Sequence, residues 1–160
     1  MAIGGQPAAS PITVTNGAAK RIAIVASSWY SEIMDGLIAG AQRACASAGV
    51  QTELMRVPGS FEIPLACRWA LDAGADAAIA LGVVIRGETP HFDYVCEAAT
   101  DGVNRVTLAT GKPIGFGILT CETEEQARER AGLLGSNEDK GYEAAHAALT
   151  MLYLQEGLNI

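Results

Sequence analysis

The chain has 160 residues, 49% of them hydrophobic, which fits one domain with a substantial core. Its formal charge of -7 at pH 7 opposes binding to nucleic acid or anionic membrane surfaces, and its apolar runs are shorter than the roughly 20 residues of a membrane span. We therefore expect neither nucleic acid nor a membrane as a partner.

The start of the chain is rich in Gly, Ala, Pro, Ser and Thr and lacks the basic start and apolar centre of an export signal. We interpret residues 1–20 as a flexible amino-terminal arm and residues 21–160 as a single domain. Neither C-x-x-C spacing nor a metal-ligand pattern is found among the cysteines, which are Cys45, Cys67, Cys96 and Cys121. Reduced thiols in the cytoplasm and no metal site are therefore expected.

Four predicted strands alternate with helices along the chain. Arg21–Ser27 and Ala77–Ile85 are continuous apolar runs, typical of strands buried on both faces. Gln51–Val57 reads as an alternating strand, and Ile114–Leu119 is the fourth. Because right-handed crossovers between such strands require a mostly parallel sheet, we predict an α/β fold: a flavodoxin-like, three-layer αβα sandwich with a four-stranded parallel sheet.

The segments between and after the strands show helical periodicity. Gly49 and Gly111 suit the carboxyl-terminal caps of two helices, and Thr123 with Gln126 forms a capping box. The predicted helices cover residues 31–48, about 61–74, about 90–109, 123 to about 131, and about 140–156. In an open parallel sheet, ligands bind outside the carboxyl ends of the strands, so the residues that follow the strands should share one edge: Trp29, Gly59–Glu62, Arg86–His91 and Leu119–Thr123.

The segment after the third strand has the chemistry of an anion site. A helix start presents free N–H groups and the positive end of a dipole, so Gly87 and the hydroxyl of Thr89 suit a phosphate there. Pro90 suits the first helical position. The same positive field favours the neutral imidazole that a general base requires, so we predict that His91 transfers protons.

Four other candidates also have purely structural interpretations. Trp29 suits a corner or interface contact as well as a platform under a flat heterocycle. The helix dipole stabilises Glu62, which could equally accept hydrogen bonds from sugar-like hydroxyls. Arg130 suits the carbonyl groups of a helix end, whereas Lys140 is a cation at a helix start, held there either by neighbouring carboxylates or by a ligand.

Three segments together resemble lumazine synthase, and these are Gly59–Pro64, Ala80–Val95, and Pro113–Thr120 followed by Glu125–Ala131. The resemblance runs from about Arg21 to the final helix. It implies condensation of 5-amino-6-(D-ribitylamino)uracil with 3,4-dihydroxy-2-butanone 4-phosphate to 6,7-dimethyl-8-ribityllumazine and phosphate, the penultimate step of riboflavin biosynthesis. It also implies that no cofactor or metal is needed.

The resemblance assigns site residues by position. Trp29, where many relatives have phenylalanine, would lie under the pyrimidine ring, and the ribityl chain would meet Ser60, Phe61 and Glu62. The ring would also contact the backbone of Val83, Val84 and Ile85. The phosphate turn would consist of Gly87, Glu88 and Thr89, with His91 as the proton-transfer residue. A neighbouring subunit would contribute Phe116 to the ring pocket, Arg130 to the phosphate, and Lys140.

Two departures from the family pattern bear on phosphate binding and assembly. Glu88 is a carboxylate where relatives commonly carry a small or neutral residue, and it would repel phosphate unless its side chain points to solvent. The loop Gly132–Lys140 is longer than in shell-forming relatives, which favours a free homopentamer over a sixty-subunit shell. Two alternative functions remain: a flavin-binding carrier or storage module without turnover, and a purely structural shell protein.

Overall fold

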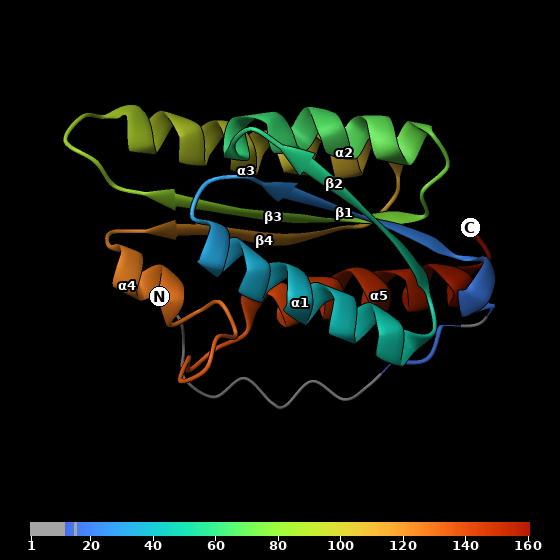
Figure 1. Ribbon diagram of the computed structural model, residues 1–160. Coiled ribbons are helices and arrows are strands. Elements are labelled where there is room, and N and C mark those ends of the chain that lie inside the picture. The colour runs from blue at the N-terminus through green and yellow to red at the C-terminus, as the bar shows by residue number, and fades with distance from the viewer. Residues whose placement is uncertain (1–11, 15) are drawn as a thin grey trace.

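The computed structural model describes residues 12–14 and 16–160 and has the predicted layered α/β architecture (Figure 1). The four strands, which are β1 (Arg21–Ser27), β2 (Gln51–Val57), β3 (Ala77–Ile85) and β4 (Ile114–Cys121), form a parallel sheet in the order β2-β1-β3-β4. Strand β4 continues two residues beyond the predicted end because Thr120 and Cys121 pair with the last residues of β3.

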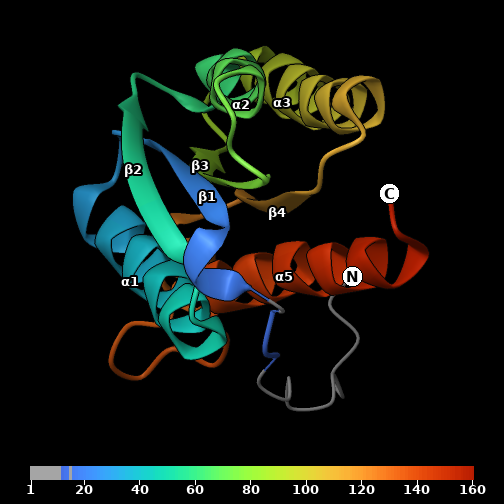
Figure 2. The ribbon, with the colours of Figure 1, turned by 90° about the vertical axis from the view of Figure 1, so that its right-hand side faces the viewer.

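Helices cover both faces of the sheet. The helices α1 (Ser31–Ala48) and α5 (Lys140–Leu158) lie on one face, and α2 (Ile63–Asp72) and α3 (His91–Thr110) lie on the other (Figures 1 and 2). Three shorter elements complete the fold: η1 (Gly17–Ala19), η2 (Ser60–Glu62) and α4 (Glu124–Arg128). The prediction of a three-layer sandwich is confirmed.

The interior strands are buried on both faces, as their continuous apolar runs predicted. Every residue of β1 after Arg21 is buried, and so are the first seven of β3. By contrast, the prediction that buried and exposed residues alternate along β2 is wrong. Strand β2 lies at the edge of the sheet, and only its last residue, Val57, is buried. The apolar runs therefore mark the middle of the sheet.

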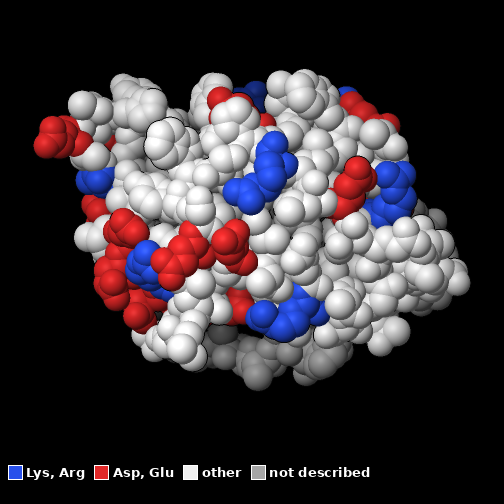
Figure 3. Space-filling view, viewed as in Figure 1, with Lys and Arg blue, Asp and Glu red and all other residues white. Residues whose placement is uncertain are grey.

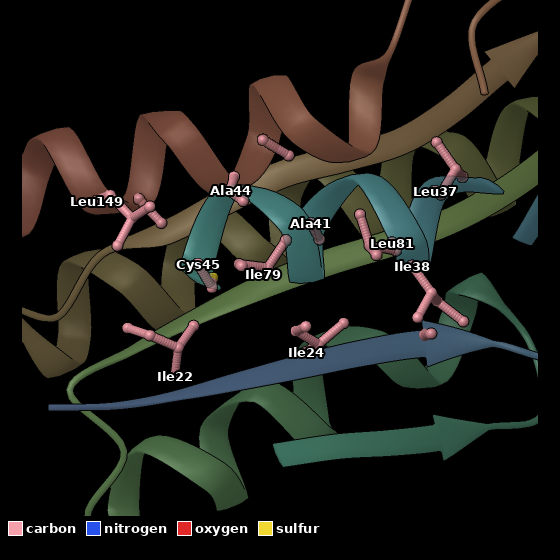
Figure 4. Close-up of a cluster of buried hydrophobic side chains, with 14 of the residues drawn as sticks. Ile22, Ile24, Leu37, Ile38, Ala41, Ala44, Cys45, Ile79, Leu81 and Leu149 are labelled. Atoms are coloured by element: carbon pink, nitrogen blue, oxygen red, sulfur yellow. The ribbon is translucent and has the colours of Figure 1, made fainter. Parts of the chain in front are cut away.

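The core divides into two clusters, one on each face of the sheet. Figure 4 shows Ile24 and Ile79 from the sheet directed toward Leu37 and Cys45 of α1, with Leu149 of α5 beside them. The second cluster joins alternate strand residues to α2 and α3, and it includes Val25, Ala80, Ile63 and Leu71. Between α1 and α5, a Cβ on Gly141 would lie 2.0 Å from the carbonyl oxygen of Leu37, so only glycine permits this close helix packing.

Several helix details differ from the predictions. The segment from Ser60 to Asp72 is a 3-10 turn followed by an α-helix, and its stripe Phe61, Leu65 and Trp69 is 54–64% exposed. This outward apolar row, which we call the α2 stripe, is therefore not the core face. Pro90 is the N-cap of α3 rather than its first residue.

The region around α4 also differs in detail. Helix α4 ends at Arg128, three residues before the predicted end, and the Arg128 carbonyl accepts from the Ser136 hydroxyl. The predicted capping box is half correct. The Thr123 hydroxyl accepts from Gln126 N–H as expected, but the Gln126 side chain accepts from Glu122 N–H instead of Thr123 N–H.

The predicted arm packs against the domain before Arg21. Val14 is 3% exposed and belongs to the core, and the Lys20 carbonyl accepts from Gln51 N–H at 3.1 Å. The described part of the predicted arm thus contacts the domain at Val14 and Lys20, whereas the rest lies outside the described residues.

The cysteines are free thiols, as predicted. Burial raises the pKa of Cys45 to about 11 and that of Cys67 to about 12. Within residues 12–14 and 16–160, no helix combines the length and apolar character that crossing a membrane requires.

Candidate active site

A cavity of about 620 Å³ opens where β1, β2 and β3 end, and we call it the His91 cavity. Its lining combines predicted site residues with Gly59, which belongs to the predicted edge, and with three residues that the sequence did not single out, Tyr30, Pro58 and Val95. The predicted residues in the lining are Trp29, Ser60, Phe61, Glu62, Val83, Val84, Ile85 and His91. Aromatic, carboxylate, hydroxyl and imidazole groups from four segments therefore meet in one place.

Trp29 lies in a loop that hydrogen bonds hold to the end of β2. The Ser28 N–H donates to the Pro58 carbonyl at 3.3 Å, and the Ser28 hydroxyl donates to the Val57 carbonyl at 2.8 Å. The indole beside this anchor is 69% exposed, so its face is open to a ligand. Tyr30 follows with a left-handed φ of 59°, a conformation that sequence patterns do not reveal for tyrosine.

Ser60 and Glu62 supply polar groups to the cavity. Ser60 is 6% exposed, and its hydroxyl has no hydrogen-bond partner among the described residues. Because a buried hydroxyl is normally satisfied, this group is available to a ligand or to water. The Glu62 carboxylate accepts from Gly59 N–H at 2.9 Å, so one of its oxygens fixes the turn and the other remains an acceptor.

The turn from Gly87 to Thr89 lies between β3 and α3 and is exposed. Its residues adjoin His91 but are not part of the lining of the His91 cavity. The Thr89 hydroxyl accepts from the His91 N–H at 3.4 Å, and nothing lies within 4 Å of a Cβ built on Gly87. The Glu88 side chain is exposed, as phosphate binding at this turn would require.

A second cavity, of about 260 Å³, holds the three residues predicted to come from a neighbouring subunit: Phe116, Arg130 and Lys140. We call it the Arg130 cavity, and its remaining lining is the stretch of β4 from Gly117 to Cys121. It shares no lining residue with the His91 cavity. In one chain, the predicted imidazole and the predicted phosphate-binding arginine therefore occupy different cavities.

The two cations of the Arg130 cavity have partners within the chain. Lys140 Nζ lies 2.7 Å from Glu138 Oε2 and 2.8 Å from Glu143 Oε2. Partial burial opposes the charged form of Lys140, but these hydrogen bonds prevail and raise its pKa. The Arg130 guanidinium donates to the Gln126 carbonyl at 2.8 Å and forms no ion pair with any residue in the described part of the chain. Arg130 therefore keeps most of its donors for an anion.

The surroundings are acidic rather than metal-binding. Figure 3 shows acidic side chains gathered toward one end of the molecule, with basic side chains among them. Arg128 lies 2.8 Å from Glu32 and 3.4 Å from Glu124, so part of this charge is paired. Among the described residues, no group of three or more His, Cys, Asp or Glu side chains could hold a metal ion.

Comparisons with known proteins identify the family of the chain. A family model described as 6,7-dimethyl-8-ribityllumazine synthase matches residues 19–156. The chain is 61% identical over 134 residues to a protein of that name from Leifsonia xyli subsp. xyli, covering 84% of this chain and 85% of the relative. It is 54% identical over 154 residues to one from Clavibacter michiganensis subsp. michiganensis, covering 96% of each, and 58% identical over 139 residues to one from Kocuria rhizophila, covering 86% and 88%.

Proposed function

The chain belongs to the 6,7-dimethyl-8-ribityllumazine synthase family, and we propose that its active site is the His91 cavity of one subunit completed by the Arg130 cavity of a neighbour. The chain condenses 5-amino-6-(D-ribitylamino)uracil with 3,4-dihydroxy-2-butanone 4-phosphate to give 6,7-dimethyl-8-ribityllumazine and phosphate. This is the penultimate step of riboflavin biosynthesis. The relatives reported above are named as synthases rather than as flavin carriers.

In the proposed binding mode, the His91 cavity holds the aminouracil. The exposed indole of Trp29 stacks on the pyrimidine ring, whose edge meets the backbone of Val83–Ile85. The ribityl chain lies along Ser60, Phe61 and Glu62, where the unpartnered Ser60 hydroxyl and the free Glu62 oxygen take up its hydroxyl groups. Phe116 from the neighbour closes the ring pocket.

The phosphorylated substrate lies between the turn and the neighbour's arginine. N–H groups of Gly87 and Glu88 and the Thr89 hydroxyl bind phosphate at the start of α3, while the exposed Glu88 carboxylate points away. Arg130 of the neighbour, which forms no ion pair among the described residues of its own chain, binds the phosphate from the other side. Lys140 reaches the site as a cation kept charged by Glu138 and Glu143.

The reaction then needs positioning and proton transfer. The substrate amine attacks the ketone and loses water to form an imine, phosphate leaves, and ring closure with loss of a second water completes the product. His91 lies at the cavity wall and moves the protons in these steps, while Arg130 orients the leaving phosphate. No residue in this scheme has to form a covalent bond to substrate.

A single observation carries the proposal of a shared site, namely that the imidazole and the arginine lie in separate cavities of one chain. A ring in which the same two surfaces meet at every interface brings them together. The α2 stripe extends the rim of the His91 cavity through Phe61 and offers this interface an apolar surface. A free homopentamer in the cytoplasm, where the thiols stay reduced, is the proposed assembly and location.

The test is to mix the purified chain with both substrates and follow lumazine absorbance, lumazine fluorescence and phosphate release. We expect His91→Ala to lower kcat by roughly 100-fold or more while binding weakens less, since proton transfer contributes on that scale. Arg130→Ala should chiefly raise KM for the phosphorylated substrate. His146→Ala and Arg105→Ala are matched controls outside both cavities. Tight riboflavin binding without turnover in the wild-type chain would instead establish a flavin carrier.

A further inference from the structure

Arg86 joins three elements around the phosphate turn. Its N–H donates to the Cys121 carbonyl at 3.0 Å, so its backbone continues the pairing of β3 with β4. Its side chain reaches Glu122 at the end of β4, with Nε 2.6 Å from Glu122 Oε2. The same guanidinium contacts the first turn of α3, with NH1 3.4 Å from Asp93 Oδ1 and Cζ 4.4 Å from the centre of the Phe92 ring.

The turn between these contacts has little support of its own. Among the described residues, Gly87 and Glu88 make no hydrogen bond to another part of the chain, and both are exposed. The position of the turn is therefore set by its two ends. Arg86 forms the first end, and its guanidinium holds the second end through Phe92, which is 8% exposed and thus firmly packed. His91 is the residue directly before this packed ring.

The charges around Arg86 also support a role at the phosphate turn. Glu122 and Asp93 place two carboxylates beside the turn, and Glu88 lies within it. Without the guanidinium, the Glu122 and Asp93 carboxylates would lie near a dianionic phosphate with their charges uncompensated. With it, the planar fork pairs with both neighbouring carboxylates while stacking on an aromatic ring, a combination that lysine cannot reproduce.

We propose that Arg86 is a positioning residue, which fixes the phosphate turn and the His91 imidazole by clamping the end of β4 to the first turn of α3. This inference rests on the proposed assignment of residues 87–89 as the phosphate site. It goes beyond the assigned site residues because Arg86 lies outside the linings of both cavities and acts through its neighbours.

The experiment compares Arg86→Gln and Arg86→Lys with Arg105→Gln. Arg105 also lies in an ion pair of α3, with Nε 2.6 Å from Asp101 Oδ2, but it is remote from the turn in sequence. For Arg86→Gln we expect KM for the butanone phosphate and the inhibition constant of inorganic phosphate to rise, and kcat to fall, by roughly 10- to 100-fold, the scale of a small misplacement. KM for the aminouracil should stay within about twofold, and Arg86→Lys should recover part of the loss.

A further variant separates positioning from simple charge. Glu122→Gln removes a negative charge near the turn, so it should improve phosphate binding if Arg86 acts only as a positive charge. The clamp predicts the opposite sign, because Glu122 orients the guanidinium at 2.6 Å. Tighter inhibition by inorganic phosphate in Glu122→Gln would overturn the proposal.

Two further outcomes would also overturn the clamp. One is kinetics of Arg86→Gln equal to those of Arg105→Gln. The other is a parallel rise in KM for both substrates with a lowered melting temperature and no recovery in Arg86→Lys, which would show a role in stability alone. The wild-type chain tests the underlying assignment separately: inorganic phosphate must compete with the butanone phosphate there, whatever the Arg86 variants do.

Discussion

The two cavities at the carboxyl end of the sheet are lined by side chains of different chemical character. The His91 cavity collects an exposed indole, a partnerless hydroxyl, a carboxylate and an imidazole, and it contains no lysine or arginine. The Arg130 cavity is smaller, lies along β4, and contains two cations with one aromatic ring. One cavity therefore suits a flat, hydroxylated heterocycle, and the other suits an anion.

On the proposed assignment of the site, a single chain is chemically incomplete. Condensing a ribitylated uracil with a phosphorylated ketone requires both kinds of surface against one pair of substrates. The chain places the two surfaces apart, and the ion pairs near them do not bridge them: Lys140 pairs with Glu138 and Glu143, whereas Arg86 pairs with Glu122 and Asp93. In the proposed site, completion therefore depends on the assembly.

The largest expected effect comes from mixing two impaired variants, assayed with the butanone phosphate below the raised KM of Arg130→Ala. When His91→Ala and Arg130→Ala chains are coexpressed with different tags, one interface type in the mixed ring combines an intact His91 cavity with an intact Arg130 cavity. With random assembly of equal amounts, about one quarter of the interfaces are of this type in any closed ring. We expect activity per subunit to return to about that fraction of wild type, measured as lumazine formation by the purified mixed species.

The matched control pairs His91→Ala with the double variant His91→Ala/Arg130→Ala, in which no interface is complete. Recovery in that control would show that the activity does not depend on His91. No recovery in the first mixture, although both tags are present in one assembly, would show that each site lies within one subunit.

We expect an effect of intermediate size when a charged side chain is introduced into the proposed interface. Leu65 is 54% exposed in the α2 stripe, and Leu65→Glu places a carboxylate in a contact that the ring would desolvate, at a cost of several kcal/mol. Sedimentation should show a smaller species with a native circular dichroism spectrum, and activity should fall with the dissociated fraction. The control is Leu54→Glu, because Leu54 is 42% exposed and pairs with Ile24, which faces α1 and α5. Dissociation of the control alone would assign the interface to the opposite face.

Local patterns in the sequence predicted most of the fold. The runs Arg21–Ser27 and Ala77–Ile85 match β1 and β3 to the residue, because strands buried on both faces must be continuously apolar. Gly49 and Gly111 cap α1 and α3 with φ of 74° and 67°, as only a residue without Cβ does readily. The grouping of Trp29 with His91 followed from the rule that strands of one sheet end at a common edge.

The remaining features depend on contacts that no local pattern encodes. The outward direction of Leu65 and Trp69 depends on which side of α2 meets the sheet, and apolar residues lie on both sides of that helix. The partnership of Arg86 with Glu122 spans 36 residues and follows from the register of β3 with β4. Tyr30 adopts its left-handed conformation at the junction of β1 and α1, and tertiary structure rather than propensity selects it.

The smallest expected effect is a change in the alkylation rates of two thiols, Cys121 near Arg130 and Cys96 near Arg86. Burial raises the pKa of Cys121, which lines the Arg130 cavity, and Arg130 opposes this shift. Burial also raises the pKa of Cys96 on α3, where Asp93 adds to the shift and Arg86 opposes it. Because alkylation consumes the thiolate, Arg130→Met should slow Cys121 alone and Arg86→Met should slow Cys96 alone, each by about threefold or less.

The measurement is iodoacetamide labelling at pH 8, followed by peptide mass spectrometry. Cys45 and Cys67 serve as internal references, since their pKa values of about 11 and about 12 leave almost no thiolate in the native state. Equal slowing of Cys96 and Cys121 in both variants would mean that each arginine changes the electrostatic potential at both thiols. Separate responses would instead show that Arg86 and Arg130 act on electrostatically distinct surroundings within one chain.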